Sequence, residues 1–232
     1  MLSISISAFL LGLLHSLEPD HMVMLSTILA KYKNSFRSLL MGIFWGLGHA
    51  LMVILFAIIL FYIKNLLPEN IFIIFEFLVA ILLLYSGFNL VKSSLSRKNI
   101  SQTNHNHNHP HDYFQISKIE NKNNIKNNTE NIKKNTFSFL SGSIQGLAGS
   151  GTIIALLFAG FANLSQLLNG VIFFGLGTII SMAIFSFILS FSLNYCAHCR
   201  FSGLKYLNHF FPICIGFLAM IFGFYKIVNV IF

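Results

Sequence analysis

Charged residues are scarce in this sequence. Asp, Glu, Lys and Arg make up only 9% of its 232 residues, whereas 55% are hydrophobic. A soluble domain usually carries about a quarter charged residues, and no soluble core of this length needs so much apolar surface. The scarcity of charge therefore excludes an ordinary soluble domain and indicates a chain surrounded by lipid.

Other absences narrow the class of protein further. Three cysteines with one close pair are no disulfide framework. No Lys or Arg precedes the apolar N-terminal stretch, which also lacks a small-x-small cleavage site, so we expect a first membrane span there rather than a signal peptide. The sequence has no Gly-rich phosphate loop with Lys, so we expect no enzyme. The net charge of +8 lies mostly between apolar runs, which argues against a nucleic-acid partner.

Long apolar runs take the place of charge. A helix needs about 20 mostly apolar residues to cross a bilayer, and no Asp, Glu, Lys or Arg occurs between Phe137 and Cys199. Because backbone polar groups must be paired within hydrocarbon, these runs predict helices, with a turn at 163–166. We expect an all-α polytopic membrane protein with six transmembrane helices, roughly at 2–30 (interrupted), 38–63, 70–92, 137–162, 166–192 and 204–231.

A polar stretch at 96–135 divides these helices into two groups of three. It is rich in Asn, Lys, Ser and His, so we expect a disordered cytoplasmic insert. The predicted organisation is a first three-helix repeat at 1–95, the insert at 96–135 and a second three-helix repeat at 136–232. Lys and Arg gather in connections one, three and five, which predicts a multi-pass protein of the cytoplasmic membrane with the insert in the cytoplasm and both termini outside.

The two halves resemble each other in sequence. Three pairs of segments match in the same order and at a nearly constant offset: 12–17 with 142–147, 44–49 with 173–178, and 85–88 with 221–224. Since each half has an odd number of spans, the second half must enter the membrane in the opposite sense. The sequence therefore predicts inverted repeats, an architecture of transporters, with helix breaks at Pro19 in one half and at Gly149 and Gly151 in the other.

The first predicted span contains a cluster of ionisable residues. His15, Glu18, Asp20 and His21 lie within seven residues of each other, and ionisable groups inside a span are functional candidates by default. Imidazole with carboxylate suits divalent first-row metals, whereas Mg²⁺ and Ca²⁺ take oxygen ligands. Residues six apart in a straight helix point ~240° apart, but unwinding at Pro19 would let His15, Asp20 and His21 converge.

His49 adds a third imidazole. It follows Gly46 and Gly48, which permit close approach of helices, and it is either a ligand of the same site or a hydrogen-bonding residue between helices. Glu18 either ligates or faces a pore entrance. The predicted metal ligands are thus His15, Asp20, His21 and His49, and the predicted lining from the second half is Gln145, Ser150 and Thr178.

The pattern His15-x-x-x-x-Asp20-His21 resembles the signature of the nickel/cobalt transporter family. With Gly12 before it and the Gly-x-Gly-His of the second span, it is similar to the UreH-like and NicO-like branches. The segment 145–151 resembles their second-half motif, except that Gln145 stands where His is expected, which argues against metal ligation by the second half. The resemblance covers the spans but not the insert. It implies transport of Ni²⁺ or Co²⁺, in uptake or efflux, without a prosthetic group.

Two further groups of residues are candidate accessory metal sites. Histidines at alternate positions in a flexible chain chelate metals weakly, although biased composition explains them equally. A Cys-x-His-Cys segment offers only part of a four-ligand site. The two groups are His105, His107, His109 and His111, and Cys196, His198 and Cys199. Besides the lipid bilayer and the metal ion, a cytoplasmic metallochaperone is a candidate partner.

Three other functions compete with metal transport. A thiol-disulfide electron conduit needs paired cysteines in spans one and four, and neither span contains one. An exporter of a small organic solute would explain the repeats but not the histidine–aspartate cluster. A non-transporting accessory membrane protein of urease or hydrogenase maturation would bind metal without moving it, and a flux measurement distinguishes it from a permease.

Overall fold

The computed structural model describes residues 2–30, 34–63, 70–96, 132–147, 160–198 and 202–231. Within these ranges the chain is helical and contains no strand. The helices are α1 (Leu2–His15), α2 (Pro19–Leu29), α3 (Ser35–Ile63), α4 (Asn70–Ser96), an unlabelled helix at 132–146, α7 (Leu164–His198) and α8 (Ser202–Ile231).

Four of these helices are long and apolar enough to cross a membrane, namely α3, α4, α7 and α8. The bent pair of α1 and α2 makes a fifth span if it is counted as one. The prediction of an all-α polytopic membrane protein is therefore confirmed at this level. Of the fourth predicted span, 137–162, residues 148–159 lie outside the described part of the chain.

The helices extend further than their apolar runs. Ser96 still belongs to α4, and residues 132–135 already belong to the next helix, although both stretches are polar and fell within the predicted insert. Hydrogen bonding along a helix continues past the point where side chains stop being apolar, so hydropathy underestimates helix length. The predicted turn at 163–166 lies instead at 160–163, because the Asn163 carbonyl accepts bonds from the first turn of α7.

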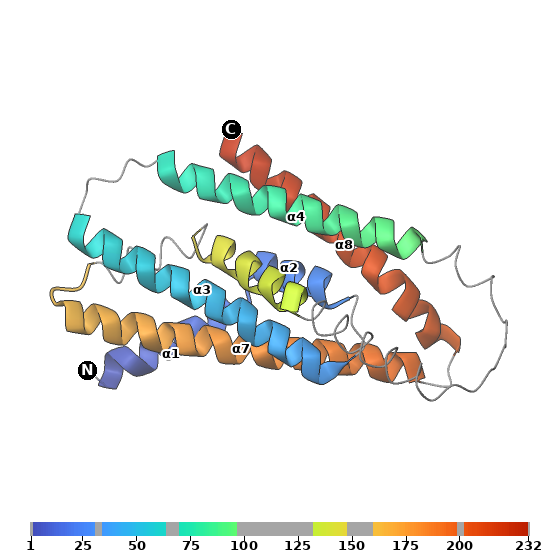
Figure 1. Cartoon of the computed structure of the whole chain (residues 1–232), viewed down its shortest axis with the longest axis horizontal. Helices are drawn as coiled ribbons and strands as arrows, with labels where there is room; N and C mark the ends of the chain where they lie inside the picture. Colours follow the sequence, from blue (N-terminus) through green and yellow to red (C-terminus); the bar gives the residue numbers. More distant parts are fainter. Residues whose placement is uncertain are drawn as a thin grey trace, which may run out of the picture.

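The helices form an elongated bundle in which α2 is central. Figure 1 shows α1, α3 and α7 along one side and α4 with α8 along the other, while α2 and the helix at 132–146 lie between them. The contacts agree, because α3 and α1 pack on α7, α4 packs on α8, and α2 touches α3, α4, α7 and α8. Seven successive residues at 23–29 of α2 are buried. The short half-helix that follows the break is thus held from several sides.

Glycines let helices from the two halves of the chain approach closely. A Cβ atom at Gly12 of α1 would meet the backbone of Phe174 in α7, and one at Gly142 would meet the backbone of Trp45 in α3. In the internal sequence match, Gly142 aligns with Gly12, and Trp45 aligns with Phe174. The second contact therefore repeats the first one, with the two halves of the chain in exchanged roles.

The same exchange holds for a second pair of contacts. A Cβ atom at Gly48 would meet the carbonyl of Phe139, and one at Gly177 would meet the carbonyl of Phe9. Between α4 and α8, Gly87 and the aligned Gly223 each lie against the backbone of the opposite helix. In lipid there is no hydrophobic force that drives helices together, so their association depends on close packing. Small residues such as glycine permit that packing.

We predict that Gly177→Leu destabilises the bundle. The added side chain would meet backbone atoms of α1, which cannot rotate away, and overpacking of this kind costs about 1–3 kcal/mol or more. The neighbouring Leu176 is 44% exposed on the outer face of α7, so Leu176→Phe is the matched control. Thermal unfolding followed by size-exclusion chromatography in detergent should show a lowered midpoint for Gly177→Leu only. Equal midpoints would contradict the close packing.

Candidate metal centre

The site begins at the break in the first span. α1 ends at His15 and α2 begins at Pro19, and the two helices are bent by 58° relative to each other. Glu18 lies between them with an extended backbone, and its N–H donates to the His15 carbonyl at 3.1 Å. Pro19 has no N–H to continue α1, but its fixed φ suits the first position of a new helix. The interruption therefore leaves the His15 carbonyl paired within the chain.

Three imidazoles converge beside this break. His15 at the end of α1, His21 in the first turns of α2 and His49 in the middle of α3 are all buried. Their ring centroids are 4.8 to 5.1 Å apart, and Nε2 of His15 lies 3.2 Å from Nε2 of His49. One nitrogen from each ring falls within 4.8 Å of the others, a spacing that a single metal ion can bridge.

Two imidazole nitrogens at this site are buried without a partner among the described residues. They are Nε2 of His21 and Nδ1 of His49. A buried polar atom left unsatisfied costs about 1–3 kcal/mol, so such atoms are kept where a ligand supplies the missing contact. Neutral imidazole nitrogen is a ligand for zinc, copper, iron and nickel. The donors at this site therefore fit a transition-metal cation.

Carboxylates fix the orientation of two of the rings. Nδ1–H of His15 donates to Oε1 of Glu18 at 3.0 Å, and Nδ1–H of His21 donates to Oδ1 of Asp20 at 2.8 Å. A carboxylate only accepts, so it selects the ring tautomer whose Nε2 keeps its lone pair. Carboxylate–histidine pairs of this kind orient metal ligands and raise their basicity. Nε2 of His21 is thereby prepared to bind a cation, and Nε2 of His15 is the acceptor in its 3.2 Å contact with Nε2 of His49.

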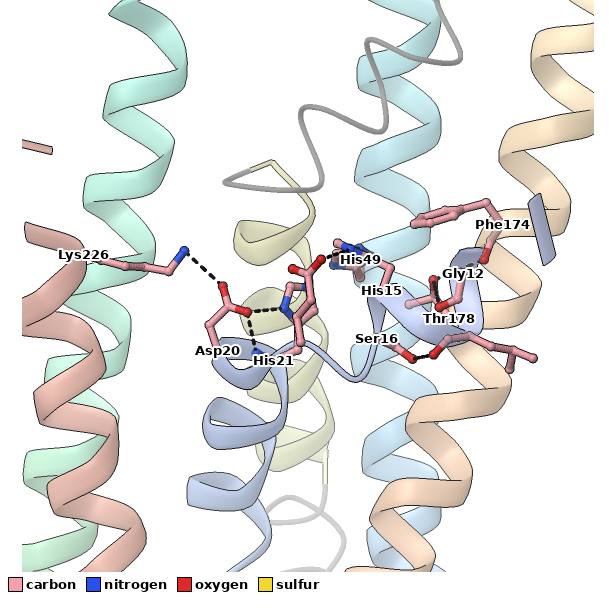
Figure 2. A network of polar contacts seen from close by, with 11 residues as sticks. Gly12, His15, Ser16, Asp20, His21, His49, Phe174, Thr178 and Lys226 are labelled. Carbon is pink, nitrogen blue, oxygen red and sulfur yellow. Dashed lines mark hydrogen bonds and ion pairs between the residues drawn. The ribbon is translucent and has the colours of Figure 1, made fainter. Parts of the chain in front are cut away.

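A lysine from the last helix completes the polar network. Nζ of Lys226 in α8 lies 3.0 Å from Oδ2 of Asp20, with both side chains largely shielded. Figure 2 shows the lysine on the side of Asp20 away from the imidazoles. Lys226 was not among the predicted site residues. The available signal was a single lysine inside an apolar span, which is costly in lipid and therefore functional by default.

Aromatic side chains close the cluster on two sides. The indole of Trp45 stacks on His49 at 5.3 Å with the planes 12° apart, and it meets the edge of His21 at 5.2 Å. The ring of Phe174, brought close by the packing at Gly12, lies 5.3 Å from His15. Both aromatic residues are fully buried. Apolar walls exclude water and strengthen the electrostatic interactions of the polar groups they surround.

The predicted second-half residues have different positions. Nε2 of Gln145 approaches the Asp20 carbonyl at 3.5 Å, and its buried Oε1 has no partner among the described residues. The hydroxyl of Thr178 is directed at the backbone, 3.1 Å from the Phe174 carbonyl and 3.4 Å from that of Gly12. Gln145 thus touches the backbone of the site, whereas Thr178 joins α7 to α1. Ser150, Gly149 and Gly151 lie outside the described residues.

The accessory candidates fall mostly outside the described part of the chain. Cys196 and His198 belong to the last turns of α7. Glu76 is half-buried in α4 and belongs to neither of the two groups of possible ligands found among the described residues. The remaining candidates, which lie outside the described residues, are His105, His107, His109, His111 and Cys199.

Fold and site together define a polytopic helical membrane protein with a histidine–carboxylate centre buried at a broken helix. Over 229 residues the chain is 30% identical to the urease accessory protein UreH of Bacillus sp. (strain TB-90). The matched region covers 99% of this chain and 92% of the relative. The chain belongs to this UreH family, the UreH-like branch of the nickel/cobalt transporter superfamily. No family model matches the chain, and no solved structure matches it.

We predict that Asp20→Asn weakens metal binding although Asp20 already has partners for both oxygens. The amide loses the acceptor strength that orients His21, and such changes typically reduce metal affinity about 10- to 100-fold. Glu76→Gln, which removes a carboxylate from α4 outside the cluster, is the matched control and should bind normally. Titration calorimetry with Ni²⁺ on the purified protein measures both. Equal affinities for Asp20→Asn and wild type would refute the orienting role.

Proposed function

We propose that this protein is a permease that moves a divalent transition-metal cation, Ni²⁺ or Co²⁺, across the cytoplasmic membrane. The observation that carries the proposal is the convergence of three buried imidazoles, with Nε2 of His21 left without a partner, at a helix break inside an apolar bundle. A hydrated cation gives up water to enter such a site, and fixed nitrogen donors replace that water. Nickel and cobalt accept these donors, whereas magnesium and calcium favour oxygen.

We propose six spans arranged as two inverted three-helix repeats around this site. The proposal is supported by contacts that recur with the halves exchanged, Gly12 on Phe174 and Gly142 on Trp45. Transporters built from inverted repeats bind their substrate where the repeats meet, next to broken helices. In this chain the first half supplies the three imidazoles. The second half supplies Lys226 and the contact from Gln145 to the site backbone.

The proposed orientation follows the positive-inside rule, with the insert in the cytoplasm and both termini outside. An ion that leaves the site on the inner side would reach the histidines at 105–111 or a cytoplasmic metallochaperone. No nucleotide is required, because a divalent cation carries two charges through the membrane potential. Each charge is worth about 2.3 kcal/mol per 100 mV, and that field can drive uptake.

A second candidate is a membrane accessory protein that binds the metal without transporting it. The printed name of the relative from Bacillus sp., a urease accessory protein, favours this alternative. The buried cluster serves a binder as well as a carrier, so the two functions differ only in net movement of the ion.

Flux into vesicles tests the proposal. The purified protein is reconstituted into liposomes with an internal metal-sensitive dye, and Ni²⁺, Co²⁺ or Mg²⁺ is added outside. We expect Ni²⁺ and Co²⁺ to enter, with flux falling to the level of protein-free vesicles for His15→Ala/His21→Ala, because both ligands are gone. Glu76→Gln is the control that should retain flux.

The outcomes distinguish the two candidates. Calorimetric binding of Ni²⁺ with no flux above protein-free vesicles would support the accessory protein and overturn the permease. Wild-type flux in the double variant, with both proteins eluting as the same folded species, would overturn the metal site itself.

A further inference from the structure

Two different sets of possible metal ligands share His21. One set consists of His15, His21 and His49 and is entirely nitrogen, and the other consists of Glu18, Asp20 and His21 and contains two carboxylates. Within each set the ligand atoms lie within 4.8 Å of one another. Nitrogen donors favour nickel, cobalt and zinc, whereas carboxylates favour manganese and magnesium. The set that takes the ion therefore decides which ions the protein accepts.

Both oxygens of Asp20 are already engaged. Oδ1 accepts two hydrogen bonds from His21, at 2.8 Å from the ring Nδ1–H and at 3.0 Å from the backbone N–H. Oδ2 lies 3.0 Å from Nζ of Lys226, which reaches it from α8 near the opposite end of the sequence. In Figure 2 the carboxylate lies between the ammonium on one side and the imidazoles on the other.

We propose that Lys226 determines metal specificity. Its ammonium holds Asp20 as the partner of His21 and keeps this carboxylate from coordinating the transported ion, so the three imidazoles make the selection. The inference rests on the proposed function, because it concerns how the same site chooses its substrate.

Electrostatics supports this role in two ways. An ammonium that touches the oxygen-rich set repels a second cation from it, and the repulsion is strong where water is scarce. The same charge compensates Asp20, since an unpaired carboxylate inside an apolar bundle is costly. Without Lys226, Oδ2 loses its partner, and the carboxylate becomes available to a hard divalent ion beside Glu18.

The test measures dissociation constants for Ni²⁺ and Mn²⁺ by calorimetry, on the full-length protein in lipid nanodiscs. Lys226→Met removes the charge at similar side-chain length, and we expect the preference for Ni²⁺ over Mn²⁺ to fall by about tenfold, mainly through tighter Mn²⁺ binding. Lys226→Arg keeps the charge and should retain the wild-type preference. Lys92→Met removes a charge from an exposed position of α4 and is the matched control.

Two further variants keep the inference testable if Lys226→Met does not fold. Lys226→Gln preserves a hydrogen-bond donor toward Asp20 without the charge, and it should shift the preference in the same direction. Asp20→Asn/Lys226→Met leaves no unpaired charge, and it should lose the gain in Mn²⁺ affinity because the carboxylate is gone.

The possible results are unambiguous. The inference is overturned if the ratio of the Ni²⁺ and Mn²⁺ affinities in Lys226→Met and Lys226→Gln equals that of wild type. If both affinities fall by the same factor, the ratio is also unchanged, and Lys226 is then a structural residue. Either result leaves the proposed permease function unaffected, provided that the wild-type protein binds and transports Ni²⁺. Absence of Ni²⁺ flux in wild type defeats the proposed function itself, whatever the variants do.

Discussion

The pairing of ionisable side chains inside an apolar bundle is the constraint on which this structure depends. Charges and imidazoles are expensive in lipid, so each must find a partner within the protein. In the part of the chain that the structure describes, one network does this: Glu18 pairs with His15, and Lys226 pairs with Asp20, which in turn pairs with His21. Because these pairs engage Nδ1 of His15 and Nδ1 of His21, the Nε2 atoms of these two rings are left for other contacts, and one nitrogen from each of the three rings lies within 4.8 Å of the others. The same contacts that make the polar groups tolerable also prepare a binding site.

Close helix packing brings the third imidazole to this place. Glycines in α1, α3, α7 and the helix at 132–146 remove the side chains that would separate the backbones. His49 then lies against His15 and His21, with the indole of Trp45 stacked on it. The break before Pro19 matters equally, since it lets His15 at the end of one half-helix meet His21 on the next. Backbone geometry and side-chain chemistry are thus two parts of one arrangement.

Much of this was predictable from the sequence, for identifiable reasons. Apolar runs of about 20 residues predict α3, α4, α7 and α8 well, because bilayer thickness sets that length. The three histidines could be singled out as candidate ligands because ionisable residues are rare in such runs, and their role as ligands stays a prediction. The pairing of Lys226 with Asp20 could not be predicted, because the two residues come from helices at opposite ends of the chain and no sequence motif connects them. The role of Asp20 as a direct ligand stays a prediction. Both of its oxygens have partners within the protein, so a cation would have to displace His21 or Lys226 to bind this carboxylate.

The most direct measurement of the central claim is the coordination shell of a bound ion. X-ray absorption at the nickel edge, on the purified protein loaded with one equivalent of Ni²⁺, reports ligand type and the outer scattering of imidazole rings. The account predicts a nitrogen-dominated shell with imidazole scattering that weakens in His49→Ala. A shell of oxygen or sulfur alone, with a spectrum that His49→Ala leaves unchanged, would contradict it.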